Sequence, residues 1–350
     1  MPLPDFLIQI NDQNFEMYVD NHMLATYSVC PRLFYYKHIL NRRPKGGISF
    51  YPAYGIWWHK VMEHFYANLG EGFCVEQLFA IAAKQWSADF MNSFATSDPK
   101  RFEKMTGSYG NMTVGGEYET PISALTMVKQ YYDQFYEKDR RDWRIISVEG
   151  GFGHEKEVKL GSFYLFHDIY VTVYYTGRPD LVVMDSQDRI FPVDHKSTDK
   201  IKSNLENLYK PHSETAGYIY TIQTILEKPC DRCIINVAAR EVPAKDRETG
   251  EIKPRYKRIH PFYSPEELKE WRHNAFLKCE EIAKLALLMP TMPEEWGMRE
   301  TQCFQFGRNC DFHEVDRVKP ESREMVLDSN FVLSDPWRPY EKRKEEQAGE

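Results

Sequence analysis

Hydrophobic positions recur along this chain with two different spacings. Leu125, Val128, Tyr132 and Phe135 follow the three-to-four residue spacing of an amphipathic helix. Spacing of this kind predicts helices near 20–42, 54–70, 75–95 and 121–140. Residues 97–120, which are rich in Gly, Ser, Thr and Asn, predict a loop that could lie over a substrate groove.

Beyond residue 140 the apolar runs become short, as expected for strands. The runs at 181–184 and 190–193 are separated by the polar stretch 185–189, which predicts a hairpin. The predicted strands lie at 144–150, 163–175, 181–185, 190–195, 233–242 and 255–263. Helices are predicted near 205–227 and from Pro265 to Met289. The alternation predicts an α/β fold.

Composition limits the number of domains and the class of protein. A chain of 350 residues with 42% hydrophobic content can bury one large core, or one core and a helical accessory domain. We expect an N-terminal helical region over 1–140, a catalytic core with the C-terminal cysteines over 141–320, and a tail over 321–350 that is partly disordered. No apolar run reaches membrane-spanning length and no signal-peptide pattern is present, so no membrane partner is expected.

The number of cysteines and the net charge indicate the cellular compartment and exclude one class of nucleic-acid-binding protein. Seven cysteines, an odd number, argue against a secreted disulfide scaffold and for a reducing compartment. A net charge of −7 argues against a general nucleic-acid coat protein. The charge still permits a locally basic channel: lysines follow residue 196, and basic residues crowd a segment over 245–258 that could equally be a solvated charged loop.

The predicted hairpin places two carboxylates together. Asp180 precedes its first strand and Asp194 ends its second, so antiparallel pairing brings them side by side. Two such carboxylates repel unless a divalent cation lies between them, and oxygen ligands suit Mg²⁺ or Mn²⁺. Lys196 should point to the same side as Asp194 and can polarise an attacking water. Singly, Asp180 could cap a strand and Lys196 could be a solvated lysine. The joint spacing favours a metal site for phosphodiester cleavage.

A helix upstream offers further ligands. Gly55, His59 and Glu63 are spaced four residues apart and therefore share one helical face. His59 and Glu63 can then both point into the site. In isolation His59 would be a core histidine, and Glu63 could equally be an exposed or helix-pairing residue.

These residues resemble the PD-(D/E)XK nuclease signature, with Asp180 as its first carboxylate and Asp194-His195-Lys196 as its D-x-K tripeptide. The helix with His59 and Glu63 is similar to that of the RecB-like branch. The resemblance implies a restriction-endonuclease-like core, with a central mixed sheet flanked by helices and an added N-terminal helical region. It also implies Mg²⁺ or Mn²⁺ held by His59, Asp180, Asp194 and the carbonyl of His195, with Lys196 acting on water and Glu63 as a further catalytic candidate.

Additional family positions match incompletely. The branch carries a Q-x-x-x-Y motif that contacts DNA, and here Tyr218 matches while Glu214 replaces the glutamine, which keeps the acceptor and loses the donor. Lys200 and Lys202 are further candidates for DNA contact. Glu149 lies where the family often has a carboxylate, although the Gly-Gly pair that follows could simply end the strand.

The terminal cysteines resemble those of RecB-like nucleases that carry an iron-sulfur cluster. Cys30-Pro31, Cys303 and Cys310 match three of the four positions, and Asp316 stands where the last cysteine is expected. The resemblance implies a [4Fe-4S] cluster, with Asp316 or His313 as fourth ligand. Zn²⁺ and reduced core thiols are the alternatives. The C-x-x-C at 230–233 favours a structural role.

We therefore expect a stand-alone, metal-dependent DNA nuclease, similar to the RecB-like exonucleases of bacterial and phage recombination systems. Its place would be the cytoplasm of a bacterial or phage-infected cell, in recombination, repair or replication. DNA with a free end or a single strand would be the substrate, with a recombination or annealing protein as a candidate partner. The alternatives are a non-catalytic DNA-binding or assembly subunit on a nuclease fold, and a structure-specific or RNA-directed endonuclease.

Overall fold

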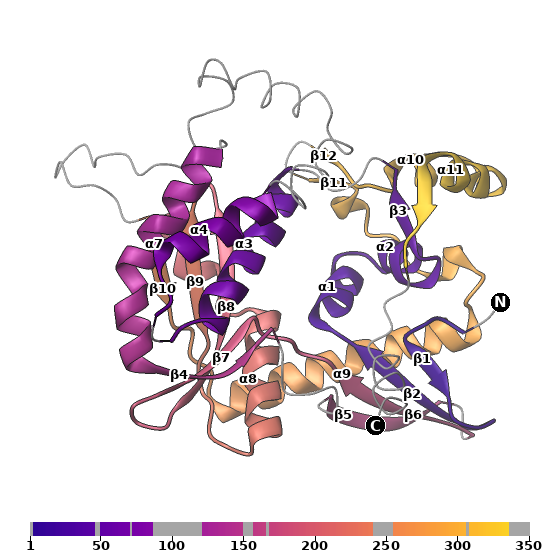
Figure 1. The fold of residues 1–350 in the computed structure, drawn as a ribbon. Helices are drawn as coiled ribbons and strands as arrows, with labels where there is room; N and C mark the ends of the chain where they lie inside the picture. Colours follow the sequence, from indigo (N-terminus) through magenta and orange to yellow (C-terminus); the bar gives the residue numbers. More distant parts are fainter. Residues whose placement is uncertain are drawn as a thin grey trace, which may run out of the picture. The chain divides into compact units, whose positions relative to one another are not determined.

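The computed structural model describes residues 3–45, 50–70, 72–86, 121–149, 157–165, 168–240, 255–305 and 308–335 (Figure 1). The chain forms two compact units, each assembled from separate segments. The first unit comprises 1–45, 152–177 and 264–350, and the second comprises 46–151 and 178–263. The domain boundaries expected near 140 and 320 stay a prediction, and the expected loop at 97–120 and the end of the tail from 336 lie outside the described residues.

A five-stranded mixed sheet forms the centre of the second unit. Its order is β10-β9-β8-β7-β4, in which β8 and β9 are parallel and the other neighbours are antiparallel. The strands are β4 (Trp143–Val148), β7 (Leu181–Asp185), β8 (Ile190–Thr198), β9 (Ile234–Ala239) and β10 (Tyr256–Ile259). The mixed α/β architecture expected from the sequence is confirmed.

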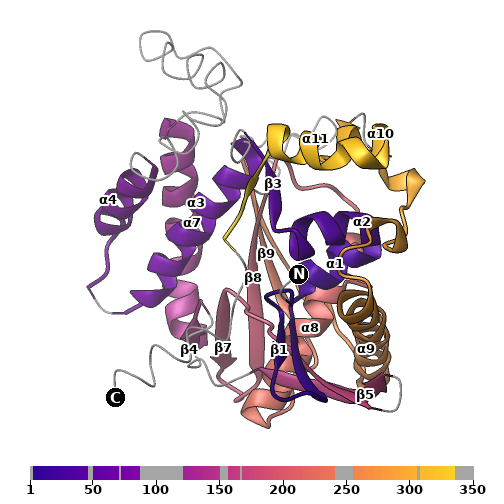
Figure 2. The same ribbon diagram turned by 90° about the vertical axis from the view of Figure 1, so that its right-hand side faces the viewer.

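Helices cover both faces of this sheet. The helices α3 (Phe50–Ala67), α4 (Val75–Gln85) and α7 (Pro121–Asp142) gather on one side and α8 (Ser213–Leu226) is on the other (Figure 2). Alternation along β8 separates the two faces, since the His195 ring stacks on Tyr66 of α3 whereas Lys196 reaches Glu214 of α8.

The β7–β8 hairpin has the register that the sequence predicts. Leu181 pairs with Val193, so Asp180 and Asp194 lie at the same end of the hairpin. At the other end, the Asp185 carboxylate accepts hydrogen bonds from the backbone N–H groups of Gln187 and Arg189, which closes the turn.

The first unit contains a four-stranded sheet of order β1-β2-β6-β5. Helix α9 (Pro265–Leu288), as long as predicted, contacts two of these strands and α1 (Figure 2). It begins at a capping box in which the Ser264 and Glu267 side chains each accept the other's backbone N–H. Gly161 permits its approach to β5, because a Cβ there would lie 2.6 Å from the Phe276 ring. The strands and the adjoining helix are β1 (Leu7–Gln9), β2 (Asn14–Val19), β5 (Val158–Leu165), β6 (Ile169–Tyr175) and α1 (Asn21–Val29).

Three local predictions were wrong. The single strand predicted at 163–175 is the antiparallel pair β5 and β6, because apolar positions continue through both and hide the reversal. The single helix predicted at 20–42 breaks at Cys30, whose extended backbone precedes Pro31. Its remainder is α2 (Pro31–Phe34) and a π-helix (Tyr35–Ile39). Strands β1 and β2 in the supposedly helical N-terminal region were missed.

Smaller elements complete the chain. The predicted helix at 205–227 is a 3₁₀ turn (Leu205–Leu208) followed by α8. The C-terminal part of the first unit forms β11 (Phe304–Gln305), β12 (Arg308–Asn309), α10 (His313–Arg317), α11 (Arg323–Asn330) and β13 (Phe331–Leu333), which pairs with β3 (Arg42–Pro44). Short 3₁₀ turns lie at Pro293–Glu295, Glu300–Gln302 and Pro320–Ser322. Within the described ranges, no helix combines the length and the apolar character needed to cross a bilayer.

Candidate metal centre

Asp180 is held from two sides at the start of the hairpin. Its Oδ2 accepts a hydrogen bond from the backbone N–H of His195 at 2.7 Å and lies 3.0 Å from Nδ1 of His59 in α3. Burial alone would raise the pKa of Asp180, but the His59 contact and the His195 N–H outweigh it and lower that pKa. Burial lowers the pKa of His59, and the Asp180 hydrogen bond and nearby carboxylate charges raise it by more. The structure therefore joins the predicted helix face to the predicted hairpin.

A chain of polar contacts runs from Asp194 to α8. The Asp194 side chain is 2% exposed, and its Oδ2 lies 2.9 Å from Nζ of Lys196. The same ammonium lies 3.1 Å from Oε2 of Glu214, whose Oε1 accepts a hydrogen bond from the Tyr218 hydroxyl at 3.2 Å. Lys196 does share the side of Asp194, as strand alternation predicts. The Glu214 carboxylate thus accepts hydrogen bonds from both Lys196 and Tyr218, as a glutamate in place of the glutamine still can.

Glu149 joins this site from β4, although the predicted metal-binding set left it out. It follows β4 directly and donates its backbone N–H to the Asp180 carbonyl at 2.7 Å. Its φ of 51° is uncommon for a residue with a side chain and costs about 1–2 kcal/mol. One ligand atom each from His59, Glu149 and Asp180 lie within 4.8 Å of one another. The signal in the sequence was a carboxylate just after a strand, but the pairing of β4 with β7 could not be deduced.

The carboxyl group of Glu149 is short of positive charge. Burial is the largest cause that raises its pKa to about 7, followed by the negative charge of Asp180, with Glu63 adding to the effect. Arg178, 3.6 Å away, and His59 oppose the shift without cancelling it. A divalent cation would supply the missing charge, and one imidazole with two carboxylates is a donor set that Mn²⁺ accepts and Mg²⁺ tolerates. These residues thus fit a divalent metal ion.

Asp194 shows the same shortage of positive charge. Burial raises its pKa to about 7 in spite of Lys196, and the charges of Asp180 and Glu214 add to the rise. In this structure Asp194 pairs with Lys196 and is not one of the three groups within 4.8 Å of one another. Its place among the metal ligands stays a prediction.

The His195 side chain points away from the carboxylates into the core. It is 1% exposed, its ring stacks on Tyr66 at 5.3 Å, and its Nδ1 lies 2.9 Å from Nδ2 of Asn236. Asn236 also contacts the Tyr131 hydroxyl at 2.5 Å. The orientation of the ring does not affect the backbone carbonyl of His195. Metal binding by that carbonyl stays a prediction.

Behind His195 lies a buried ion pair of Arg258, so at this residue the interpretation of the 245–258 segment as a solvated loop is wrong. Arg258 donates two hydrogen bonds to Asp139 of α7, at 2.7 and 2.6 Å, and its guanidinium lies 3.9 Å from the centre of the Phe135 ring. The Tyr66 hydroxyl donates to the same carboxylate at 2.8 Å. Arg255 is also buried, at 6% exposure. Residues 241–254 lie outside the described residues.

Three other predicted positions have simpler surroundings. Glu63 lies one turn beyond His59 in α3, close enough for its charge to act on Glu149. Lys200 and Lys202 are exposed just after β8. Their roles stay predictions.

The terminal cysteines come together in the first unit. Cys30, Cys303 and Cys310 line one cavity of about 20 Å³, and Asp316 lines it as well. The Cys310 backbone N–H donates to the Cys303 carbonyl at 2.8 Å. In this arrangement Oδ1 of Asp316 already accepts from the Tyr36 hydroxyl at 2.8 Å. Bringing remote cysteines together agrees with the resemblance, and the iron-sulfur cluster itself stays a prediction.

The two other cysteine and histidine candidates lie elsewhere. Cys230 and Cys233 are buried, and burial raises the pKa of the Cys230 thiol to about 12, which favours the structural role. His313, the alternative fourth ligand, is not among the residues that line the cysteine cavity, and its Nδ1 lies 3.5 Å from Glu314.

The second unit has a mixed α/β fold, and carboxylates, an imidazole and an ammonium lie together at the ends of its strands. These are features of a metal-dependent hydrolase. The family model described as PD-(D/E)XK nuclease superfamily matches residues 22–315, and the chain belongs to that superfamily. Membership suggests hydrolysis of phosphodiester bonds in nucleic acids. A solved structure described as "Crystal structure of SSO0001" is similar, with a TM-score of 0.25 and 9% identity over 74% of this chain and 84% of that one. No curated protein matches.

Proposed function

We propose that this protein is a divalent-metal-dependent deoxyribonuclease that degrades DNA from an end, in recombination, repair or replication. The main support is the approach of His59, Glu149 and Asp180 to within 4.8 Å of one another, in a chain of a nuclease superfamily. The preference for DNA ends rests on the resemblance of the sequence to RecB-like exonucleases.

The metal would be held by His59, Glu149 and Asp180, with Asp194 and the carbonyl of His195 completing the set. A divalent cation bound there supplies Lewis-acid chemistry that offsets the charge gathering on the scissile phosphate.

Lys196 acts as a charged donor and not as a base. Burial lowers the pKa of its amine, but Asp194 and Glu214 raise it by more, so the group stays an ammonium. An ammonium can orient a water for attack and stabilise a phosphate oxygen, but it cannot take a proton. Tyr218 is a positioning residue in this account, because its hydroxyl holds Glu214 and Glu214 holds Lys196.

The test compares end-labelled linear DNA with covalently closed circular DNA in the presence of Mn²⁺. We expect loss of the end label from linear DNA, an intact circle, and no cleavage in excess chelator. Lys196→Ala, purified in parallel, controls for contaminating nucleases. Cleavage of the circle would point to an endonuclease, binding without cleavage of either DNA would point to a non-catalytic subunit, and full activity in chelator would exclude the metal.

For the first unit we propose, on the resemblance and the shared cavity, that Cys30, Cys303 and Cys310 hold a [4Fe-4S] cluster or Zn²⁺. Asp316 is the weak position, because it is engaged by Tyr36 and an oxygen ligand binds soft iron less tightly than a thiolate does. Anaerobically purified protein should be brown, and Asp316→Cys should raise the iron content per chain. Colourless protein without zinc would leave the three cysteines as reduced thiols.

A further inference from the structure

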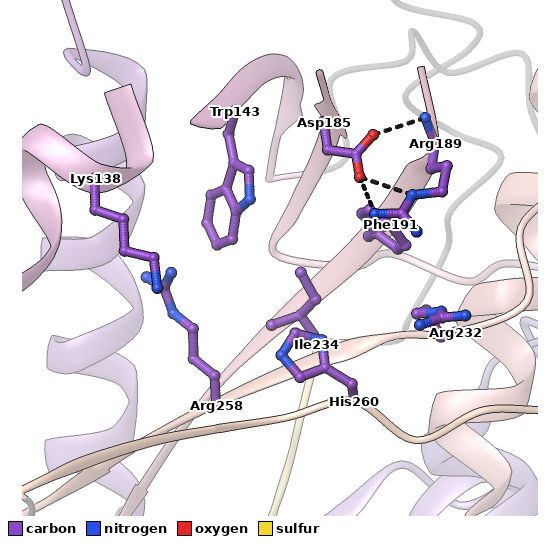
Figure 3. A pocket seen from close by; sticks show the side chains of 9 residues that line it. All are labelled: Lys138, Trp143, Asp185, Arg189, Phe191, Arg232, Ile234, Arg258 and His260. Atoms are coloured by element: carbon purple, nitrogen blue, oxygen red, sulfur yellow. Dashed lines mark hydrogen bonds and ion pairs between the residues drawn. The ribbon is translucent and has the colours of Figure 1, made fainter. Parts of the chain in front are cut away.

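The sheet of the second unit has a pocket at the end opposite the carboxylates. Its volume is about 590 Å³, and it is lined by residues of the β7–β8 turn and the nearby ends of α7, β4, β9 and β10 (Figure 3). Asp185, at the end of β7, lines the pocket, whereas Asp180 precedes β7. At about 3.3 Å per residue, the strand separates the two places by roughly 17 Å. The pocket is therefore distinct from the proposed nuclease site.

Cationic side chains surround the pocket. Lys138 comes from α7 on one side and Arg232 lies on the other, with Arg189 near the turn (Figure 3). Arg189 uses Nε and Nη2 to hold Asp185, at 2.8 and 2.6 Å. Arg232 uses the same two atoms on Asp231. Among the described residues, neither the remaining Nη1 groups nor the Lys138 ammonium has a hydrogen-bond partner. The two Nη1 groups thus remain as donors for an anion, and Lys138 is the pocket cation that no described carboxylate pairs with.

His260, which also lines the pocket, reports the local potential. Its pKa is lowered by burial and then by the positive charges of Arg258, Arg232 and Lys138. An anion held among these cations would offset their effect, so it should raise the pKa of His260.

The inner wall of the pocket is apolar. Phe191 and Ile234 are 8% and 3% exposed and Trp143 is half-buried beside them. Pockets of about 300–1,000 Å³ with apolar walls and a few polar groups are typical sites for small organic ligands. An inorganic anion would not contact this apolar wall, and an uncharged ring would not interact with the cations. The lining therefore suits a ligand that has both an anionic group and a ring.

We propose that this pocket binds a nucleoside monophosphate, with its phosphate attracted by the positive charges of Lys138, Arg189 and Arg232 around the pocket and its base against Phe191 and Ile234. The choice of ligand rests on the proposed function, because a nuclease that degrades DNA from an end releases such nucleotides beside its own surface. The pocket is then a second, metal-independent site that holds the product.

The experiment follows the His260 ring by NMR in excess chelator, with the signal assigned by its loss in His260→Gln. The probes are dAMP, deoxyadenosine and orthophosphate. We expect dAMP to raise the pKa of His260 and to bind at least tenfold more tightly than either other probe. Lys138→Gln and Arg232→Gln should each weaken dAMP binding about tenfold, since each removes a positive charge from the pocket lining. Lys84→Gln on α4, which removes a charge away from the pocket, and Lys196→Ala should leave the affinity unchanged.

Three results would overturn the proposal: a His260 pKa that ignores dAMP, orthophosphate binding as tightly as dAMP, or an equal loss of affinity in Lys84→Gln. The chelator separates this proposal from the nuclease assay. A protein that binds dAMP here but cuts no DNA would contradict the proposed function alone. A protein that cuts DNA, but in which dAMP does not change the pKa of His260, would contradict only the proposal that the pocket binds a nucleotide.

Discussion

Two buried groups of charges in the second unit differ in how their carboxylates are compensated. Asp139 receives two hydrogen bonds from Arg258 and one from the Tyr66 hydroxyl, all between 2.6 and 2.8 Å. Glu149 and Asp194 also lie among buried groups, but burial and neighbouring carboxylates raise the pKa of each to about 7. We call Asp139, Arg258 and Tyr66 the complete group, because its charges are balanced as folded. We call Glu149, Asp180 and Asp194, with His59 and Lys196, the incomplete group, because its carboxylates are short of positive charge.

This difference separates a structural role from a functional one. A buried ion pair with all its hydrogen bonds made orders its surroundings, and here it orders the residues behind His195 on β8. Carboxylates kept together without enough positive charge cost stability, and such sites persist where a ligand uses them. The complete group therefore supports β8, the strand that carries Asp194 and Lys196.

The largest effects should follow from changes to the incomplete group. Asp180→Asn, Asp194→Ala and Lys196→Ala should each lower the cleavage rate by at least about 10²–10³-fold, because each deletes a metal ligand or the donor that orients water. The fold should survive, as measured by circular dichroism and thermal unfolding. Lys228→Ala, an exposed lysine beyond α8, is the matched control. A rate like that of the unmodified protein in any of the three variants would remove that residue from the mechanism.

Changes to the complete group should instead lower stability. Asp139→Asn leaves the Arg258 guanidinium buried beside Phe135 without its partner, which should cost about 3–5 kcal/mol in urea unfolding. Asp139→Leu combined with Arg258→Met should recover most of that loss, because it removes both charges. Lys129→Gln breaks an exposed ion pair on the same helix and should cost less than about 1 kcal/mol. A double variant less stable than Asp139→Asn would show that the pair is not isolated energetically.

Local patterns in the sequence predicted some of the contacts in the incomplete group. The polar turn between two apolar runs placed Asp180 beside Asp194, and strand alternation placed Lys196 beside Asp194, as the structure has them. Period-four spacing placed His59 on the helix face that meets Asp180. Each of these inferences needed only contacts between residues close in sequence or one family motif.

Long-range pairing was beyond the sequence. Glu149 reaches the site because β4 pairs with β7, and no local pattern says which strand β7 takes as its second neighbour. The partnership of Asp139 with Arg258 joins residues 119 positions apart, and both look like ordinary surface charges in the sequence. The reversal between β5 and β6 was missed because no glycine or proline marks it.

A smaller effect should come from Glu149→Gln in chelator. The amide removes a charge that burial and Asp180 disfavour, so the variant should be equal to or more stable than the unmodified protein, by less than about 1 kcal/mol. Adding Mn²⁺ should stabilise the unmodified protein more than the variant, since a ligand that binds only the folded state adds stability according to its affinity. Thermal unfolding with and without Mn²⁺ measures both changes. A clear loss of stability in chelator would mean that Glu149 is as well compensated as Asp139.

The smallest expected effect concerns the choice of metal, and it separates the two groups by donor type. In the complete group, the Asp139 carboxylate is satisfied by hydrogen bonds from Arg258 and Tyr66. The incomplete group instead offers a metal ion the His59 imidazole nitrogen beside its carboxylate oxygens. Nitrogen donors suit Mn²⁺ better than Mg²⁺, so cleavage with Mn²⁺ should be at least as fast as with Mg²⁺, at a concentration of metal that is lower by a few-fold. His59→Asp replaces the nitrogen with oxygen and should shift the preference toward Mg²⁺, even if its total rate falls. Titration of both metals against the cleavage rate tests this, and an unchanged ratio in His59→Asp would place His59 outside the coordination sphere.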